Sequence, residues 1–155
     1  MTTPQQMAKH FRDVHFGGNW TSVNLKDVLT DVDWQMATTP INGLNTIAVL
    51  VFHVNYYVDA VLKVLQGGPL QASDKFSFDL PPITSEEDWQ RLVNKALVQA
   101  ESFAGLVERL DEKLLSEDFT DGKYGTWYRN LTGIVEHTHY HLGQIVIIKK
   151  MIKDA

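Results

Sequence analysis

The chain contains no cysteine. This absence excludes disulfide bonds, thiolate metal ligands and a cysteine nucleophile, and it agrees with a reducing compartment. Any thiol chemistry would have to use a thiol that the substrate brings. We therefore expect a cytoplasmic protein whose polar chemistry depends on other side chains.

Positive charge is also scarce, because 14 Lys and Arg residues face 19 Asp and Glu residues, which gives a net charge of −5. Binding to a phosphate backbone needs clustered cations. The only dense group is Lys149, Lys150 and Lys153, where cations complement the dipole at the end of a final helix. We therefore predict no nucleic-acid partner.

Long hydrophobic runs are missing as well. The longest one, Ile47 to Phe52, is too short to span a bilayer. The first twenty residues include Lys9, Arg12 and Asp13, which interrupt any signal-peptide core. We expect no membrane segment. The hydrophobic content of 44% over 155 residues suffices for one packed domain that spans residues 1–155.

Helical periodicity dominates the sequence that remains. Thr3 and Pro4 predict the start of a first helix, which Gly17 and Gly18 end. A connecting region follows. It runs from Asn19 to Asn45, with short helical pieces near 23–29 and 33–38 and a break at Pro40.

Three more long helices follow this connection. The second is predicted from Asn45 to Gly67. The third opens with a capping box of Thr84 and Glu87 and continues to Leu114. The fourth begins near Thr126. Together the helices predict an all-α fold, a four-helix bundle with a long connection between helices 1 and 2.

Three histidines are candidates for a metal site. His137 and His141 are four residues apart, so they lie on one face of the last helix. On the second helix, His53 shares a face with Leu50 and Tyr57. One divalent ion between the three imidazoles would give each buried ring nitrogen a partner.

Each of these histidines also has an ordinary structural explanation. His137 could face solvent, His141 could hydrogen-bond a backbone carbonyl, and His53 could pair with Tyr57 or Asp59. Spacing alone does not choose between these explanations and a metal site.

Other site types have weaker support. His10 and His15 fall near the end of the first helix, where we expect surface positions that complement its dipole. The chain has no glycine-rich phosphate loop. It also lacks the paired Glu-x-x-His motifs of di-iron bundles.

The C-terminal motif carries a family resemblance. The ending reads His137-Thr-His-Tyr-His141-Leu-Gly143-Gln144, and His53 lies on an upstream apolar helix. With Gly17-Gly18-Asn19-Trp20 and Pro40-Ile-Asn-Gly43, this pattern resembles the DinB superfamily over nearly the whole chain. The resemblance implies a four-helix bundle, usually dimeric, in which His53, His137 and His141 hold a divalent metal.

The flanking positions refine this comparison. Gly143 matches a family glycine, and since glycine costs a helix roughly 1 kcal/mol against alanine, we expect a close helix approach there. Gln144 and Tyr57 are candidates to hydrogen-bond a ligand or a substrate. Leu142 stands where many relatives carry a polar or basic residue.

The functional expectation follows from the family. Some relatives are transferases that use low-molecular-weight thiols, such as the bacillithiol- and mycothiol-dependent enzymes. Three neutral imidazoles leave an ion its full charge and an open position, and a thiol that binds there is deprotonated. The resemblance thus implies a transferase acting on a small thiol and an electrophilic substrate. Zn²⁺, Ni²⁺ and Fe²⁺ all accept imidazole ligands.

A second expectation comes from a different class. The chain could be a homodimeric structural or interaction protein whose metal only braces the helices. The sequence shows no basic cluster that would hold the anionic groups of a thiol cofactor. A pocket that opens onto the ion would favour the enzyme over the brace.

Overall fold

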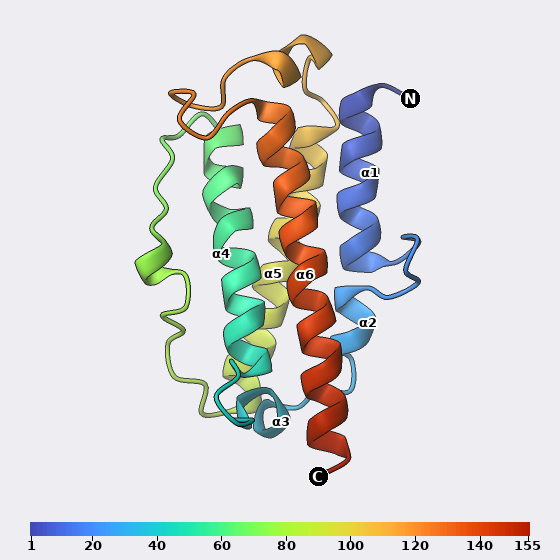
Figure 1. The fold of residues 1–155 in the computed structure, drawn as a ribbon, viewed down its shortest axis with the longest axis vertical. Coiled ribbons are helices and arrows are strands. Elements are labelled where there is room, and N and C mark those ends of the chain that lie inside the picture. The colour runs from blue at the N-terminus through green and yellow to red at the C-terminus, as the bar shows by residue number, and fades with distance from the viewer.

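A computed structural model describes residues 1–155 and contains only helices, turns and two isolated β-bridges. The predicted all-α class is confirmed. Four long helices lie side by side, with α5 behind α4 and α6 in the view of Figure 1. These helices are α1 (Thr3–Phe16), α4 (Ile47–Leu65), α5 (Glu86–Val107) and α6 (Trp127–Lys153).

The connection between α1 and α4 holds two short helices, α2 (Leu25–Leu29) and α3 (Trp34–Thr38). Both fall within the pieces expected from the sequence. Asn24 and Asp33 cap them by accepting backbone N–H bonds, as short polar residues do at a helix start. The two helices lie at the end of the bundle away from the N-terminus (Figure 1).

Two predicted helix starts are off by one residue. The side chain of Thr2, rather than Thr3, caps α1 and forms a capping box with Gln5. The side chain of Thr46, rather than Asn45, caps α4. In both places two neighbouring residues can cap a helix, and the cap is the one whose oxygen reaches the N–H three residues on.

The predicted bounds of the third long helix also need correction. Ser85, not Thr84, caps α5, and Thr84 instead donates two hydrogen bonds to the Asp88 carboxylate. The helix does not reach Leu114. It ends at Val107, and Asp111 caps a separate 3₁₀ helix, η2 (Glu112–Ser116).

The core consists of two hydrophobic clusters at opposite ends of the bundle. One surrounds Trp89, which is fully buried and donates its Nε1 proton to the Val32 carbonyl at 2.7 Å. The other surrounds the rings of Phe11 and Phe103, whose centroids are 4.3 Å apart and whose planes are tilted by 37°. On α4 and α6 the change from one cluster to the other occurs near His53 and between Val135 and Leu142.

Helix α4 is long and apolar enough to cross a membrane by length and composition. Most of this segment is buried, however, and it packs against α5 and α6. Its apolarity is therefore explained by its place in the core of the bundle, where a helix is hydrophobic on several faces.

The α4–α5 loop, residues 66–85, runs along the side of α4 (Figure 1). It is irregular except for a short 3₁₀ helix, η1 (Asp74–Phe76). Two tyrosines of α4 hold it in place. The Tyr56 hydroxyl accepts the Ser73 N–H at 2.9 Å, and the Tyr57 hydroxyl donates to Asp74. These bonds fix the loop beside the histidines.

Candidate metal centre

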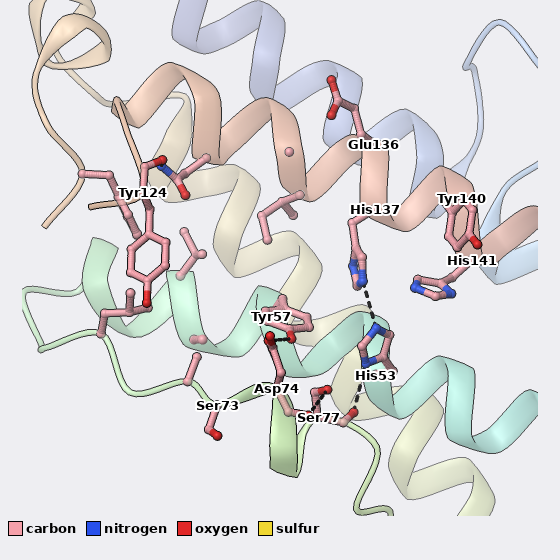
Figure 2. A pocket seen from close by; sticks show the side chains of 18 of the residues that line it. His53, Tyr57, Ser73, Asp74, Ser77, Tyr124, Glu136, His137, Tyr140 and His141 are labelled. Carbon is pink, nitrogen blue, oxygen red and sulfur yellow. Dashed lines mark hydrogen bonds between the residues drawn. The ribbon is translucent and has the colours of Figure 1, made fainter. Parts of the chain in front are cut away.

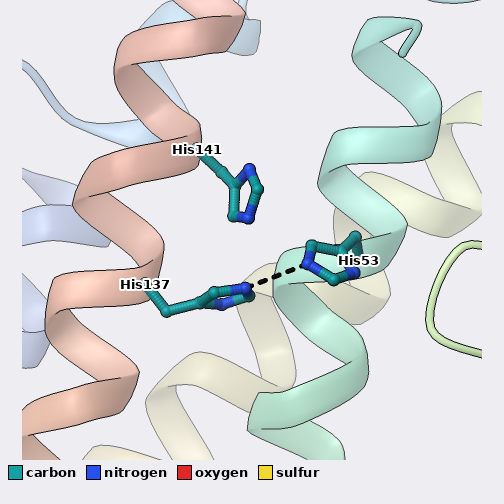
Figure 3. Close-up of side chains that lie close together, drawn as sticks. All are labelled: His53, His137 and His141. Carbon is teal, nitrogen blue, oxygen red and sulfur yellow. Dashed lines mark hydrogen bonds between the residues drawn. The ribbon is translucent and has the colours of Figure 1, made fainter. Parts of the chain in front are cut away.

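His53, His137 and His141 lie close together in the structure. Figure 3 shows His53 on α4 facing the two histidines of α6 across the gap between the helices. The three ring centroids form a nearly equilateral triangle with sides of 4.5, 4.7 and 4.8 Å. One nitrogen from each ring lies within 4.8 Å of the others. This is a group that could hold a metal ion.

The orientation of His53 is fixed by the α4–α5 loop. Its Nδ1 lies 3.1 Å from the Ser77 carbonyl, which can only accept, so Nδ1 carries the proton. The Phe78 ring stacks on the imidazole at 3.8 Å, with 9° between the planes. His53 therefore pairs with Ser77 rather than with Tyr57 or Asp59, and its Nε2 lone pair points toward the other histidines.

A side chain on the same helix orients His141. Its Nδ1 lies 2.7 Å from Oε1 of Gln144, not from a backbone carbonyl. An amide oxygen accepts a proton, so the Nε2 of His141 also keeps its lone pair. His141 is buried, and Gln144 occupies the kind of position from which outer residues set the tautomer of a histidine ligand.

His137 completes the group. Its Nε2 lies 3.0 Å from Nε2 of His53, and since the His53 proton is on Nδ1, the His137 nitrogen is the donor of this bond. Two nitrogens that each lie about 2.0–2.1 Å from a tetrahedral ion would be separated by roughly 3.3 Å. The His53–His137 pair therefore fits coordination of one ion after a shift of a few tenths of an ångström. The His141 nitrogen, which lies within 4.8 Å of the other two, would have to move closer to them.

The surroundings of His53 and His137 favour the neutral form of both rings. Burial, with smaller contributions from the neighbouring His141 and His53, lowers the pKa of His137 to about 4. Burial also lowers the pKa of His53, although its bond to Ser77 opposes that shift. Imidazole binds metal only in its neutral form, so these rings are ready to act as ligands at neutral pH.

A cavity of about 970 Å³ opens onto the triad, by which we mean His53, His137 and His141. Residues of α4, of the α4–α5 loop and of α6 line it. Figure 2 shows it extending along α6 from the triad to Tyr124 at its far end. One side of the triad is therefore accessible to a molecule in this cavity.

Tyr57 and Gln144 have different roles in this geometry. Gln144 contacts His141, as described above. The Tyr57 hydroxyl gives its only proton to Asp74, and burial, together with Asp74, raises the pKa of Tyr57. In this arrangement the Tyr57 proton holds the α4–α5 loop, so it is not free for a substrate.

Two other expectations differ from the structure. His15 is not on the surface. It is 1% exposed, its Nδ1 lies 3.0 Å from the Phe11 carbonyl, and burial lowers its pKa to about 4. Gly143 is not at a close helix approach, since a Cβ built there would meet nothing within 4 Å. His10 is exposed, as expected.

Sequence reasoning did not identify Ser77, Phe78 or Arg129. Ser77 contributes a backbone carbonyl, which no residue type reveals, and Phe78 is one of two phenylalanines in an irregular segment. Arg129 also lines the cavity. Its place a little more than two turns before His137 on α6 was the only available signal.

Comparisons of the chain with protein-family models, with curated proteins and with solved structures found no match in any of the three. The resemblance to the DinB superfamily therefore depends on the quoted residues alone. A function has to be argued from the site itself.

Proposed function

We propose that this protein is a metal-dependent transferase that joins a low-molecular-weight thiol to an electrophilic substrate. The observation that supports it is the convergence of three imidazoles at the inner end of an open cavity. Catalytic metal sites typically combine three protein ligands with one open position, whereas structural sites are closed by four. Membership of the DinB superfamily and a cytoplasmic location are part of the same proposal.

The residues present fit a divalent ion. His53 and His141 each hold an Nδ1 proton on an acceptor and offer Nε2, and His137 supplies the third nitrogen. Zn²⁺, Ni²⁺ and Fe²⁺ all accept such a ligand set. When bound, the ion would stabilise the thiolate form of a small thiol at neutral pH.

The reaction balances without a redox partner. The thiol sulfur forms a bond to an electrophilic carbon, and the leaving group departs with the electron pair of the bond that breaks. The proton of the thiol passes to solvent. No cysteine of the protein competes for the electrophile.

The protein fixes the positions of the ligands. Phe78 and Tyr140 flank the triad, with Phe78 stacked on His53 and Tyr140 edge-on to His141 at 4.9 Å. Both rings also face solvent, at 43% and 67% exposure, so they border the site without closing it. The bond from His53 to Ser77 keeps the imidazole in one orientation while substrates exchange.

The test is a screen of the metal-loaded protein against cellular thiols, each paired with a chromogenic electrophile. We expect at least one thiol to react faster with protein than without it. The His53→Ala variant should lose that acceleration by orders of magnitude, whereas His10→Ala, on the exposed face of α1, should keep it. If no thiol is accelerated, the transferase proposal fails.

A structural homodimer is the second candidate, and one observation favours it. Tyr140, Ile147 and Met151 form a stripe along α6, 67%, 59% and 41% exposed. Exposed apolar residues at helical spacing suit a helix–helix interface between two copies. Sedimentation of the parent and of Ile147→Glu would decide whether this stripe pairs, and dimerisation without thiol chemistry would favour the structural role.

A further inference from the structure

Arg129 is the only cationic side chain that lines the cavity of the triad. It forms no ion pair with any carboxylate, in contrast to Arg12 and Arg91. One of its nitrogens, Nη1, donates to the Tyr124 carbonyl at 2.8 Å. This bond fixes one side of the guanidinium and leaves its other donors without a protein partner.

The bond to Tyr124 places Arg129 at the end of the cavity away from the histidines. Tyr124 marks that end in Figure 2, and Asn130 also donates to its carbonyl, at 3.0 Å. Two side chains of α6 thus hold the Tyr124 carbonyl in place. A planar guanidinium held in one place recognises a carboxylate well, because less freedom is lost when the pair forms.

The carboxylates of the cavity lie elsewhere. Asp74 accepts the Tyr57 proton beside the triad, and Glu136 directly precedes His137. Neither carboxylate can bind a second anionic group of the thiol. With the sulfur at the ion, Arg129 is therefore the only side chain lining the cavity that would attract such a group.

We infer that the thiol used at this site carries a carboxylate that Arg129 binds, at the opposite end of the molecule from its sulfur. This inference rests on the proposed function, since it takes the sulfur to lie at the triad. It names the substrate class, a long thiol with a terminal carboxylate. Arg129 is then a specificity-determining residue.

The helix sets the length of that thiol. Arg129 and His137 are eight residues apart, which is about 12 Å along α6. The carboxylate would lie beside the guanidinium and the sulfur among the histidines, so the ligand itself is shorter than this distance along the helix. Its sulfur and its carboxylate would be on the order of 10 Å apart. That is roughly the length of three extended residues, so a thiol the size of a single amino acid cannot reach both ends.

A ladder of synthetic thiols measures this distance. The probes are mercaptopropionate, mercaptohexanoate, mercaptooctanoate and mercaptoundecanoate, each compared with the mercapto-alcohol of equal length. Binding is followed by the thiolate-to-cobalt absorption of the Co²⁺-loaded protein, which does not depend on turnover. We expect mercaptooctanoate to bind best, and to bind roughly two- to fivefold more tightly than its alcohol, as suits one ion pair to a solvent-exposed arginine.

The variants assign the preference to one side chain. Arg129→Gln should bind the acid and the alcohol equally, and Arg129→Glu should favour the alcohol. Lys123→Gln removes the same charge from a residue that lines a neighbouring cavity and not this one, so it should keep the preference. Circular dichroism of each variant checks that the fold is retained.

The outcomes separate this inference from the proposed function. If Co²⁺ binds and all thiols bind without regard to charge or length, the role of Arg129 is overturned and the transferase proposal stands. An equal loss in Lys123→Gln would also overturn it, because the cause would then be the general field of the protein. If Co²⁺ binds but no thiol does, the proposed function fails, and the inference fails with it.

Discussion

Two groups of histidines lie on different sides of α6, and only one of them forms a site. His53, His137 and His141 direct ring nitrogens toward a common point. On the other side, His10 and His139 have ring centroids 6.2 Å apart, and His15 lies deeper on α1. No shared point joins the nitrogens of this second group.

Burial does not explain the difference. His15 is less exposed than any member of the triad, yet its Nδ1 is bonded to the carbonyl of Phe11 in its own helix and its ring packs on the Phe11 ring at 4.3 Å. In the triad, the outward nitrogens of His53 and His141 bond to Ser77 and Gln144. Acceptors on the outer side are what leave the inner lone pairs free to converge.

The largest effect should come from removing one member of the triad. We expect about one divalent ion per chain in the parent and almost none in His141→Ala, with at least a hundredfold loss of affinity, because removing a ligand costs more than removing the residue that orients one. Elemental analysis after gentle purification measures this. His139→Ala is the matched control on the other side of the helix. Equal metal content in all three proteins would rule out the triad as the binding site.

In the second group of histidines, His15 should make the free energy of unfolding depend on pH. The pKa of His15 is about 4 in the folded protein, below the ordinary value of 6.5 in the unfolded chain. The unfolded state therefore binds the proton more readily, and stability falls as the pH drops from 6.5 to 4. The contribution of His15 is about 3 kcal/mol over this window.

Urea unfolding at pH 7, 5.5 and 4, in the presence of a chelator, tests this expectation. His15→Leu should lose less stability than the parent toward low pH, because its core position no longer has a ring to protonate. The triad lies on the other side of α6, so the difference between the two proteins reports on His15 and on its interaction with His139. Parallel losses in parent and variant would contradict a buried, neutral His15.

A smaller effect should follow from changing the acceptor behind His141. Gln144→Leu removes the oxygen that holds the Nδ1 proton, and we expect metal affinity to fall by roughly 10- to 100-fold. Gln144→Glu keeps an acceptor and should bind metal at least as tightly as the parent. Competition with a chromogenic chelator gives both values. An unchanged affinity in Gln144→Leu would mean that the bond does not orient the ligand.

The parts of the site that the sequence predicted are those set by a single helix. His137 and His141 share a face because of their spacing, and that inference requires no tertiary information. The fold class followed from periodicity in the same way. Helix starts were less certain because adjacent residues compete as caps, as Thr2 and Thr3 do.

The parts of the site that could not be predicted depend on the path of a loop or on how deeply one face of a helix is buried. Ser77 acts through its backbone carbonyl. Arg129 can be recognised as part of the site only once the cavity that it lines is known. The sequence predicts His15 at the surface because a cation near the end of a helix complements its dipole, yet His15 lies on the buried face of α1. For Gly143 the expectation of close packing was wrong, since that side of α6 is open.

The contact between Ser77 and His53 links the loop to the site thermodynamically. The imidazole is held in its ligating orientation only while the α4–α5 loop is docked, since the carbonyl that takes its proton belongs to that loop. By reciprocity, whatever occupies the triad must stabilise the docked loop by the same free energy with which the docked loop favours occupancy. Protection of the α4–α5 loop from proteolysis or from hydrogen exchange should therefore increase when the triad is occupied.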